Sequence, residues 1–155
     1  MQTVDQPPLE DEASLFSLGS EFLEAAKILE ATPVVKMNVS LVAYYLAGHA
    51  SELLLKSYLF QSGISLRDLK FKLCHNLSQL ISEARANGLP GSLQLDLVDK
   101  LSEHYKPKNT EYRQLATASY PPLDLLLAQV QALERQVFNH VAYFTNHREA
   151  DATRD

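Results

Sequence analysis

The stretch Leu46-Ala47-Gly48-His49-Ala50-Ser51-Glu52-Leu53-Leu54-Leu55-Lys56 decides how this chain folds. It lies within a long helix that we predict over residues 33–61, because Thr32 is a good N-cap and Pro33 suits a first helical position. A helix that is apolar around most of its circumference is buried on several sides. The residues that make it so are Val39, Leu41, Val42, Ala43, Tyr44, Leu46, Ala50, Leu53, Leu54, Tyr58 and Leu59. We therefore expect this helix to be the most buried part of a helical bundle, with its end at Gly63.

The other helices follow from apolar residues three and four positions apart. We predict them over residues 14–30, 75–87 and 92–105, and from Pro121 and Pro122 to about residue 144. The first has the inward set Leu15, Leu18, Phe22, Ala25, Ala26 and Leu29, and the last has Leu123, Leu126, Leu127, Val130, Leu133, Val137, Val141 and Phe144. Residues 106–120 show no such period and are expected to form a long loop.

These patterns predict an all-α fold, an up-and-down bundle of four to five helices with no sheet. The 155 residues suit one domain, which we place at residues 13–145. The polar tails, residues 1–12 and 146–155, are expected to be loosely held. The surplus apolar surface of the second and last helices predicts a homodimer with a two-fold interface.

Composition and charge narrow the classes of function. The net charge of −5 excludes a global basic field that would gather RNA, so a nucleic-acid partner would require a local patch. Cys74 is the single cysteine, which excludes an intramolecular disulfide, and we expect it to be a small buried hydrophobic residue. Residues 1–12 lack the apolar segment of a signal peptide, and no apolar stretch is long enough to cross a bilayer. We expect a cytoplasmic protein with no membrane partner.

Four polar residues interrupt the apolar surface of the long helix. Tyr45, His49, Glu52 and Lys56 are spaced by four, three and four, so they project from one face. Such a stripe must find partners inside the protein or reach solvent through a groove. One interpretation is a paired structural network between helices or across a dimer interface, and the other is a binding or catalytic groove. We expect Glu52 to pair with Lys56 or with a neighbouring Tyr or Arg side chain, with His49 close by.

A second segment, Cys74-His75-Asn76-Leu77-Ser78-Gln79-Leu80, follows the long helix. Together the two segments resemble the HEPN family, whose second helix often reads His, Ala, any residue, Glu, Leu and then Lys, before a loop and a helix that starts with His-Asn/Asp-Leu. The resemblance covers most of the chain. It implies a helical bundle, dimerisation, an association with partner proteins such as nucleotidyltransferases and, in active members, metal-independent ribonuclease activity.

The active members carry an Arg followed four to six residues later by a His, which serve as the phosphorane-stabilising group and the general base. Arg113 occupies roughly the expected location, but no His follows it in that window. Arg135 and His140 match the spacing formally. Five residues along a regular helix rotate a side chain by about 140°, so these two would point to different faces. The catalytic candidates Arg113, Arg135 and His140 are therefore weak.

These observations favour a non-catalytic HEPN-like helical module that dimerises and binds a partner, either a protein or nucleic acid. The alternative is a metal-independent HEPN ribonuclease of a toxin or phage-defence system. A third interpretation places a small molecule in a groove beside His49 and Glu52. No metal-ligand spacing and no phosphate-binding glycine loop occurs in the sequence, so we expect no metal and no cofactor.

Overall fold

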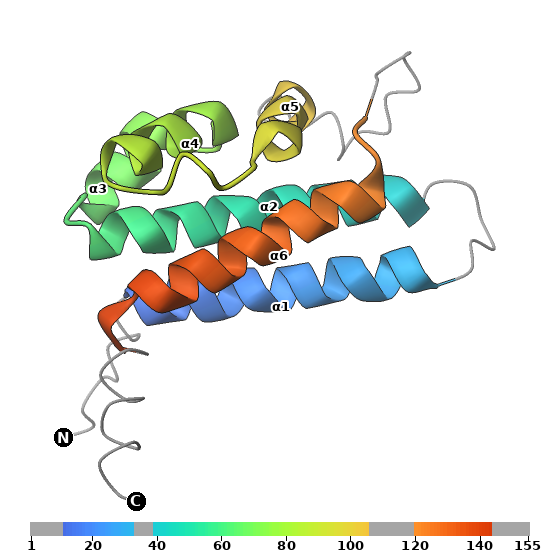
Figure 1. The fold of residues 1–155 in the computed structure, drawn as a ribbon, viewed down its shortest axis with the longest axis horizontal. Helices are drawn as coiled ribbons and strands as arrows, with labels where there is room; N and C mark the ends of the chain where they lie inside the picture. Colours follow the sequence, from blue (N-terminus) through green and yellow to red (C-terminus); the bar gives the residue numbers. More distant parts are fainter. Residues whose placement is uncertain (1–10, 33–38, 106–119, 144–155) are drawn as a thin grey trace, which may run out of the picture.

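The computed structural model describes residues 11–32, 39–105 and 120–143, and it places no strand among them. The described residues form α1 (Glu12–Ala31), α2 (Val39–Gln61), α3 (Leu66–Asp68), the π-helical turn η1 (Leu69–Leu73), α4 (Leu77–Ala86), α5 (Asp96–Tyr105) and α6 (Leu123–His140). Figure 1 shows three long helices packed side by side, with the shorter helices against one of them. The predicted all-α helical bundle is confirmed.

Two of the three long helices run in the same direction, and the third runs opposite to them. Ser57 near the end of α2 donates a hydrogen bond to the carbonyl of Glu12 at the start of α1, so these two helices are antiparallel. Tyr44 donates to the carbonyl of Pro121 just before α6, and the amide of Ala142 just after α6 donates to Gln61. Helix α6 therefore runs parallel to α2 and antiparallel to α1 (Figure 1).

Helix α2 lies at the centre of the bundle, as its apolar circumference predicts. It packs against α1, α4, α5 and α6. Its buried apolar residues are Ala43, Tyr44, Ala47, Ala50, Leu53, Leu54, Leu55, Tyr58 and Leu59. At about 25 cal/mol for each Å² of apolar surface removed from water, a helix buried on so many sides dominates the hydrophobic stabilisation of the fold.

Local signals set most helix ends. The carboxylate of Asp11 accepts from the amide of Ser14 at 2.7 Å, and the side chain of Asn76 accepts from the amide of Gln79 at 3.2 Å. Gly63 and Gly88 take positive φ angles of 101° and 100° just after α2 and α4, a conformation that costs glycine little. The predicted end of the long helix at Gly63 is confirmed.

Helix α5 begins at Asp96 rather than at the predicted residue 92. The start of α5 is set by a residue of α6, 32 positions further along the chain than Leu97. The Gln129 side chain on α6 accepts from the amide of Leu97 at 2.9 Å and donates to the carboxylate of Asp96 at 2.7 Å. A cap supplied by a distant helix leaves no pattern in the local sequence.

The inward set predicted for the first helix is wrong in part. Leu18 is 44% exposed. The buried stripe consists of Leu15, Phe16, Gly19, Leu23 and Ala26. The cause is the position of α6, which reaches α1 through Phe138 against Phe16, at 5.7 Å between ring centroids. Leu18 is rotated from Phe16 by about 200° around the helix axis, so it points away from α6.

The segment between α2 and α4 contains structure that the helical period does not predict. Leu69 is buried at 1% exposure, and its carbonyl accepts from the amide of Cys74 at 3.1 Å to close η1. Cys74 itself is exposed, so its expected burial is wrong. Its φ of 47° is unusual for a residue with a side chain and stores local backbone strain.

Several expectations concern parts of the chain outside the described residues. These are residues 1–10 and 146–155 of the polar tails, residues 33–38 at the start of the predicted long helix, most of the predicted loop at 106–120, and Phe144. Residues 11 and 12, which we assigned to the first tail, belong to the start of α1. None of the described helices combines the length and the hydrophobicity needed to cross a bilayer.

Candidate functional site

The polar stripe of α2 centres on a buried carboxylate. Glu52 is 2% exposed, and α4 and α5 cover the side of α2 on which it lies. Lys56, one turn further along α2, donates to Glu52 Oε1 at 2.6 Å. Tyr105, the last residue of α5, donates its hydroxyl to Oε2 at 2.6 Å. A buried carboxylate requires such donors, because its desolvation is otherwise costly.

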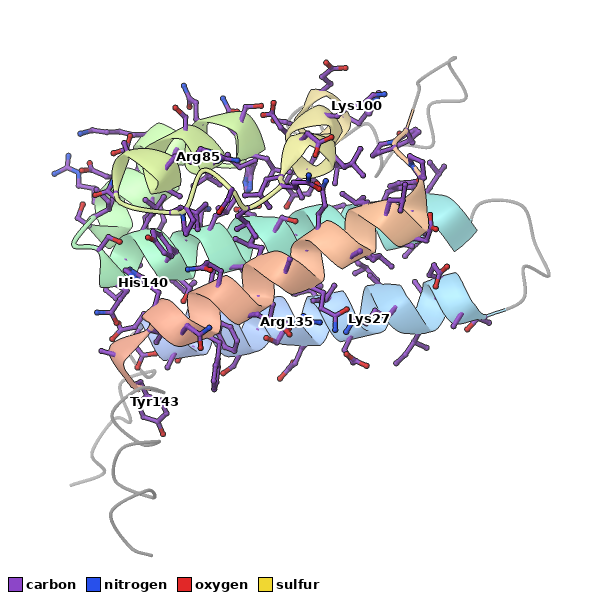
Figure 2. The ribbon with its side chains drawn as sticks, in the orientation of Figure 1. Lys27, Arg85, Lys100, Arg135, His140 and Tyr143 are labelled. Carbon is purple, nitrogen blue, oxygen red and sulfur yellow. The ribbon has the colours of Figure 1, made fainter. Side chains whose placement is uncertain are left out.

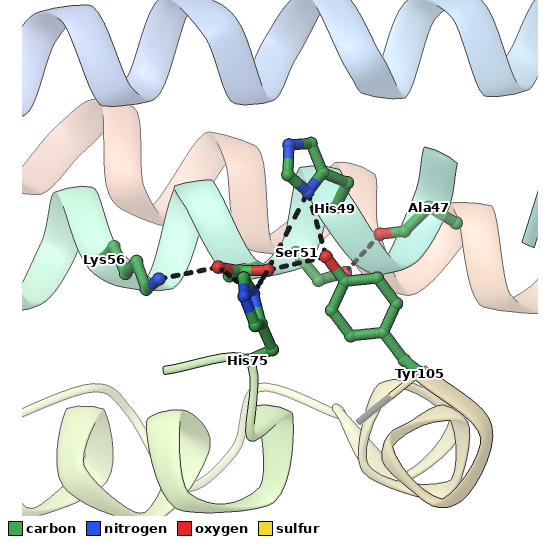
Figure 3. Close-up of polar contacts among 7 residues, drawn as sticks. Ala47, His49, Ser51, Lys56, His75 and Tyr105 are labelled. Carbon is green, nitrogen blue, oxygen red and sulfur yellow. Dashed lines mark hydrogen bonds and ion pairs between the residues drawn. The ribbon is translucent and has the colours of Figure 1, made fainter. Parts of the chain in front are cut away.

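A third donor comes from the loop before α4. The Nδ1 atom of His75 lies 3.0 Å from Glu52 Oε1 and 3.1 Å from Oε2. His49 approaches the carboxylate less closely, with Nδ1 3.8 Å from Oε2, and contacts the Tyr105 hydroxyl at 2.9 Å. We call His49, Glu52, Lys56, His75 and Tyr105 the Glu52 cluster (Figure 3).

The hydrogen-bond acceptors of the cluster determine which of its atoms carry protons. Burial raises the pKa of Glu52, but the hydrogen bond and charge of Lys56, with hydrogen bonds from Tyr105 and His75, outweigh it and leave this pKa below its ordinary value. Glu52 is therefore ionised at neutral pH and only accepts, so His75 carries a proton on Nδ1. The Tyr105 hydroxyl gives its one proton to Glu52, so it accepts from Nδ1 of His49.

Aromatic rings surround His49 on the outer side of the cluster. The ring of Phe22 on α1 meets the imidazole edge to face, with 4.4 Å between centroids. Tyr45 lies parallel to the imidazole at 6.0 Å. The His49 side chain keeps 26% exposure. Tyr45 and His49 are thus the part of the stripe that reaches the protein surface beside α1.

Gly48 allows α5 to approach α2 closely enough for this network. A Cβ atom placed on Gly48 would lie 2.5 Å from Cδ2 of Tyr105, which is closer than real Cβ contacts. Any larger residue here would displace the Tyr105 ring and lengthen its bond to Glu52. The glycine of the quoted stretch therefore has a packing role.

The predicted geometry of the stripe is confirmed: Glu52 pairs with Lys56 and a Tyr, and His49 lies next to them. The binding role assigned to Tyr45, His49, Glu52 and Lys56 stays a prediction. The helical spacing predicted neither the Tyr105 hydrogen bond nor the His75 contact. His75 stood in the segment that resembles the HEPN family, whereas Tyr105 lies 53 residues from Glu52 with no local signal.

The cluster has a clear chemical consequence. Both oxygens of Glu52 already accept hydrogen bonds from three donors that come from α2, the α4 loop and α5. A carboxylate held in this way is poorly placed to take a proton from a substrate. The arrangement instead ties α5 and the start of α4 to the central helix.

The weak catalytic candidates lie apart. Arg135 is exposed and lines a cavity with Phe16 and Ser20 of α1. His140 faces α2, where its ring stacks on Tyr58 at 3.9 Å and its Nε2 lies 3.1 Å from the Ser62 hydroxyl. Figure 2 shows the two residues at separate places along α6. The predicted divergence of Arg135 and His140 is confirmed.

Burial lowers the pKa of His140, and a hydrogen bond with the Tyr58 backbone opposes this effect only in part. A histidine in this state prefers the neutral form. The third candidate, Arg113, lies outside the described residues.

Among the described residues, no group of three or more His, Cys, Asp or Glu side chains could hold a metal ion. Comparison of the chain with family models, with curated proteins and with solved structures finds no match. The function therefore has to be inferred from the contacts of the described residues, and first from those of the Glu52 cluster.

Proposed function

We propose that this chain is a non-catalytic HEPN-like helical module that forms a homodimer and binds a partner, a protein or nucleic acid. The Glu52 cluster is the observation that carries the proposal. Its carboxylate, the one buried acidic group among the described residues, is used to hold α4 and α5 on α2. An acidic side chain engaged with three internal donors supports a structural role more than a role in bond cleavage.

The position of His140 supports the same proposal. A ribonuclease of the kind described above needs its Arg and His to meet at one phosphodiester. Here Arg135 lies beside α1, while His140 packs against Tyr58 and Ser62 of α2. The pair therefore lacks the common face that the reaction requires.

The outer side of the α1–α2 pair, rather than the last helix that the sequence pattern also suggested, is the dimer face that we propose. Leu18 is 44% exposed on α1 and Val42 is 50% exposed on α2. Val42 is rotated by about 200° from Tyr44, which faces α6, so both exposed residues point away from α6. The half-buried residues Phe22 and Tyr45 lie between them around His49. An apolar face made by two antiparallel helices can pack on its own copy around a two-fold axis.

Multi-angle light scattering at micromolar concentrations tests this proposal. We expect twice the mass of one chain for the parent protein and a single-chain mass for Val42→Asp. Leu125→Asp is the matched control, since Leu125 is 53% exposed on α6. A parent protein that remains monomeric at every concentration would contradict dimerisation. Dissociation by Leu125→Asp alone would show that the α1–α2 face is not the interface.

A further inference from the structure

The π-helical turn between α2 and α4 presents three consecutive exposed side chains. Lys70, Phe71 and Lys72 make up what we call the Lys70–Lys72 turn, and each is exposed. Leu69, buried at 1% exposure, anchors the turn to the core. The positive φ of Cys74 ends it. π-Helical turns and strained residues recur at functional sites. The three side chains are therefore exposed on a turn that Leu69 anchors to the core.

The turn is locally basic in an acidic chain. Arg67, Lys70 and Lys72 are accompanied by a single acidic residue, Asp68, within residues 64–75, whereas the whole chain has a net charge of −5. Lys72 pairs with Asp68 at 3.0 Å, but their side chains are 74% and 39% exposed. An ion pair so open to solvent is weak, so Lys72 can exchange it for an anionic ligand.

Phe71 is the most exposed large hydrophobic side chain of the described residues, at 77%. Lys70 and Lys72 are its neighbours in the sequence, so the exposed ring and two cations belong to the same turn. Proteins that bind single-stranded nucleic acids combine aromatic rings, on which bases stack, with cations that contact phosphates. The same pattern is less suited to a duplex, whose bases are already stacked.

A cavity of about 330 Å³ adjoins the turn and is lined by Lys72, His75, Asn76 and Gln79 among others. Ligand pockets in proteins begin at roughly this size. Glu52 engages Nδ1 of His75, and this side chain, which is 46% exposed, also lines the cavity. The side-chain NH2 of Asn76, whose Oδ1 caps α4, and the side-chain amide of Gln79 are groups of the kind that recognise base edges.

We infer that the Lys70–Lys72 turn binds single-stranded nucleic acid, with a base stacked on Phe71, phosphates at Lys70 and Lys72, and a neighbouring base in the cavity beside His75. This inference rests on the proposed function, because it names the partner of the module. An acidic protein segment could use the two lysines, but its carboxylates carry no ring to stack on Phe71, whereas every nucleotide joins a base to its phosphate. The stacking contact is therefore what distinguishes the two partners.

Fluorescence anisotropy with a labelled 12-nucleotide uridine RNA tests the contact in the full chain. We expect Phe71→Ala to weaken binding about tenfold, the range found when one stacked base loses its aromatic partner. For the parent, contacts with two or three phosphates give a slope of about −1.4 to −2 in a plot of log K against log salt. Lys70→Gln combined with Lys72→Gln should reduce the magnitude of that slope by about 1.4.

Two further variants serve as controls. Asp68→Asn removes the competing carboxylate and should tighten binding. Lys100→Ala removes the same charge as a lysine variant in the turn, but from α5 (Figure 2), and should change affinity less than twofold. Because Phe71 and Lys100 are both exposed, we expect unchanged melting temperatures for their variants.

The outcomes separate this inference from the proposed function. No binding by the parent, unchanged binding by Phe71→Ala, or equal competition by double-stranded RNA would overturn the inference. Equal competition by a polyglutamate peptide would assign the turn to an acidic protein partner and would also overturn it. Dimerisation is measured by the mass in light scattering, and the lack of cleavage by the length of the RNA after the binding measurement. The proposed function and the binding site can therefore each fail without the other.

Discussion

Two polar regions lie close together in the sequence, the Lys70–Lys72 turn and the Glu52 cluster to which His75 belongs, and they differ in how their charges are placed. In the Glu52 cluster, a carboxylate with 2% exposure accepts from Lys56, Tyr105 and His75. In the Lys70–Lys72 turn, the side chains extend into solvent around an exposed ring. Residue type alone therefore does not mark a site in this molecule. What distinguishes the two regions is burial: the carboxylate of Glu52 is closed off from solvent, whereas Lys70, Phe71 and Lys72 are exposed to it.

Removal of the Glu52 carboxylate should lower the stability of the protein more than any other change considered. We expect Glu52→Ala to lower the free energy of unfolding by about 2 to 3 kcal/mol, because Lys56, His75 and Tyr105 lose their common acceptor. Urea denaturation at pH 7 measures the change. Glu103→Ala, which removes an exposed carboxylate from α5, is the matched control and should stay within about 0.5 kcal/mol of the parent. If Glu52→Ala unfolds like the parent, the cluster does not stabilise the fold.

A smaller effect should follow when the cluster is distorted with all its polar groups in place. Gly48→Ala puts a Cβ where the Tyr105 ring now lies, so we expect a loss of about 1 to 3 kcal/mol from overpacking. Gly91→Ala is a suitable control, because its nearest neighbour, Arg85, would lie 3.8 Å from the new Cβ. Equal stabilities of the two variants would contradict the close packing of α5 on α2.

The smallest effect should appear as a pH dependence outside the Glu52 cluster. Burial lowers the pKa of His140 in the folded state, so its contribution is present above the unfolded pKa of about 6.5 and is lost as the pH falls below it. We expect the parent to lose stability relative to His140→Phe between pH 7 and pH 5. Denaturation curves across this range measure the difference. A constant difference would show that His140 titrates alike in both states.

Helical periodicity accounts for what could be predicted from sequence. It fixes the angles between residues on one helix, so the shared face of His49, Glu52 and Lys56 and the divergence of Arg135 and His140 follow from spacing alone. It carries no information on contacts between helices. The Tyr105 hydrogen bond and the cap that Gln129 provides for α5 join residues 53 and 32 positions apart. Both were therefore missed.

The turn before α4 was missed for a different reason. Residues 66–73 are too short for a helical period, and η1 departs from the 3.6-residue repeat on which the pattern depends. The exposure of Cys74 follows from the same turn. The local excess of Lys and Arg is visible in the sequence, but a binding site could be proposed only once the structure showed that Phe71 is exposed.

A cleavage assay with RNA tests the proposed non-catalytic function most directly. Purified parent protein, Arg113→Ala and His140→Ala are incubated with a mixed RNA pool in EDTA, since the HEPN reaction needs no metal, and the RNA lengths are followed by electrophoresis. We expect the RNA to stay intact in every sample, because Glu52 is held by internal donors and His140 faces α2. Cleavage by the parent that disappears in either variant would contradict the non-catalytic function and establish the ribonuclease.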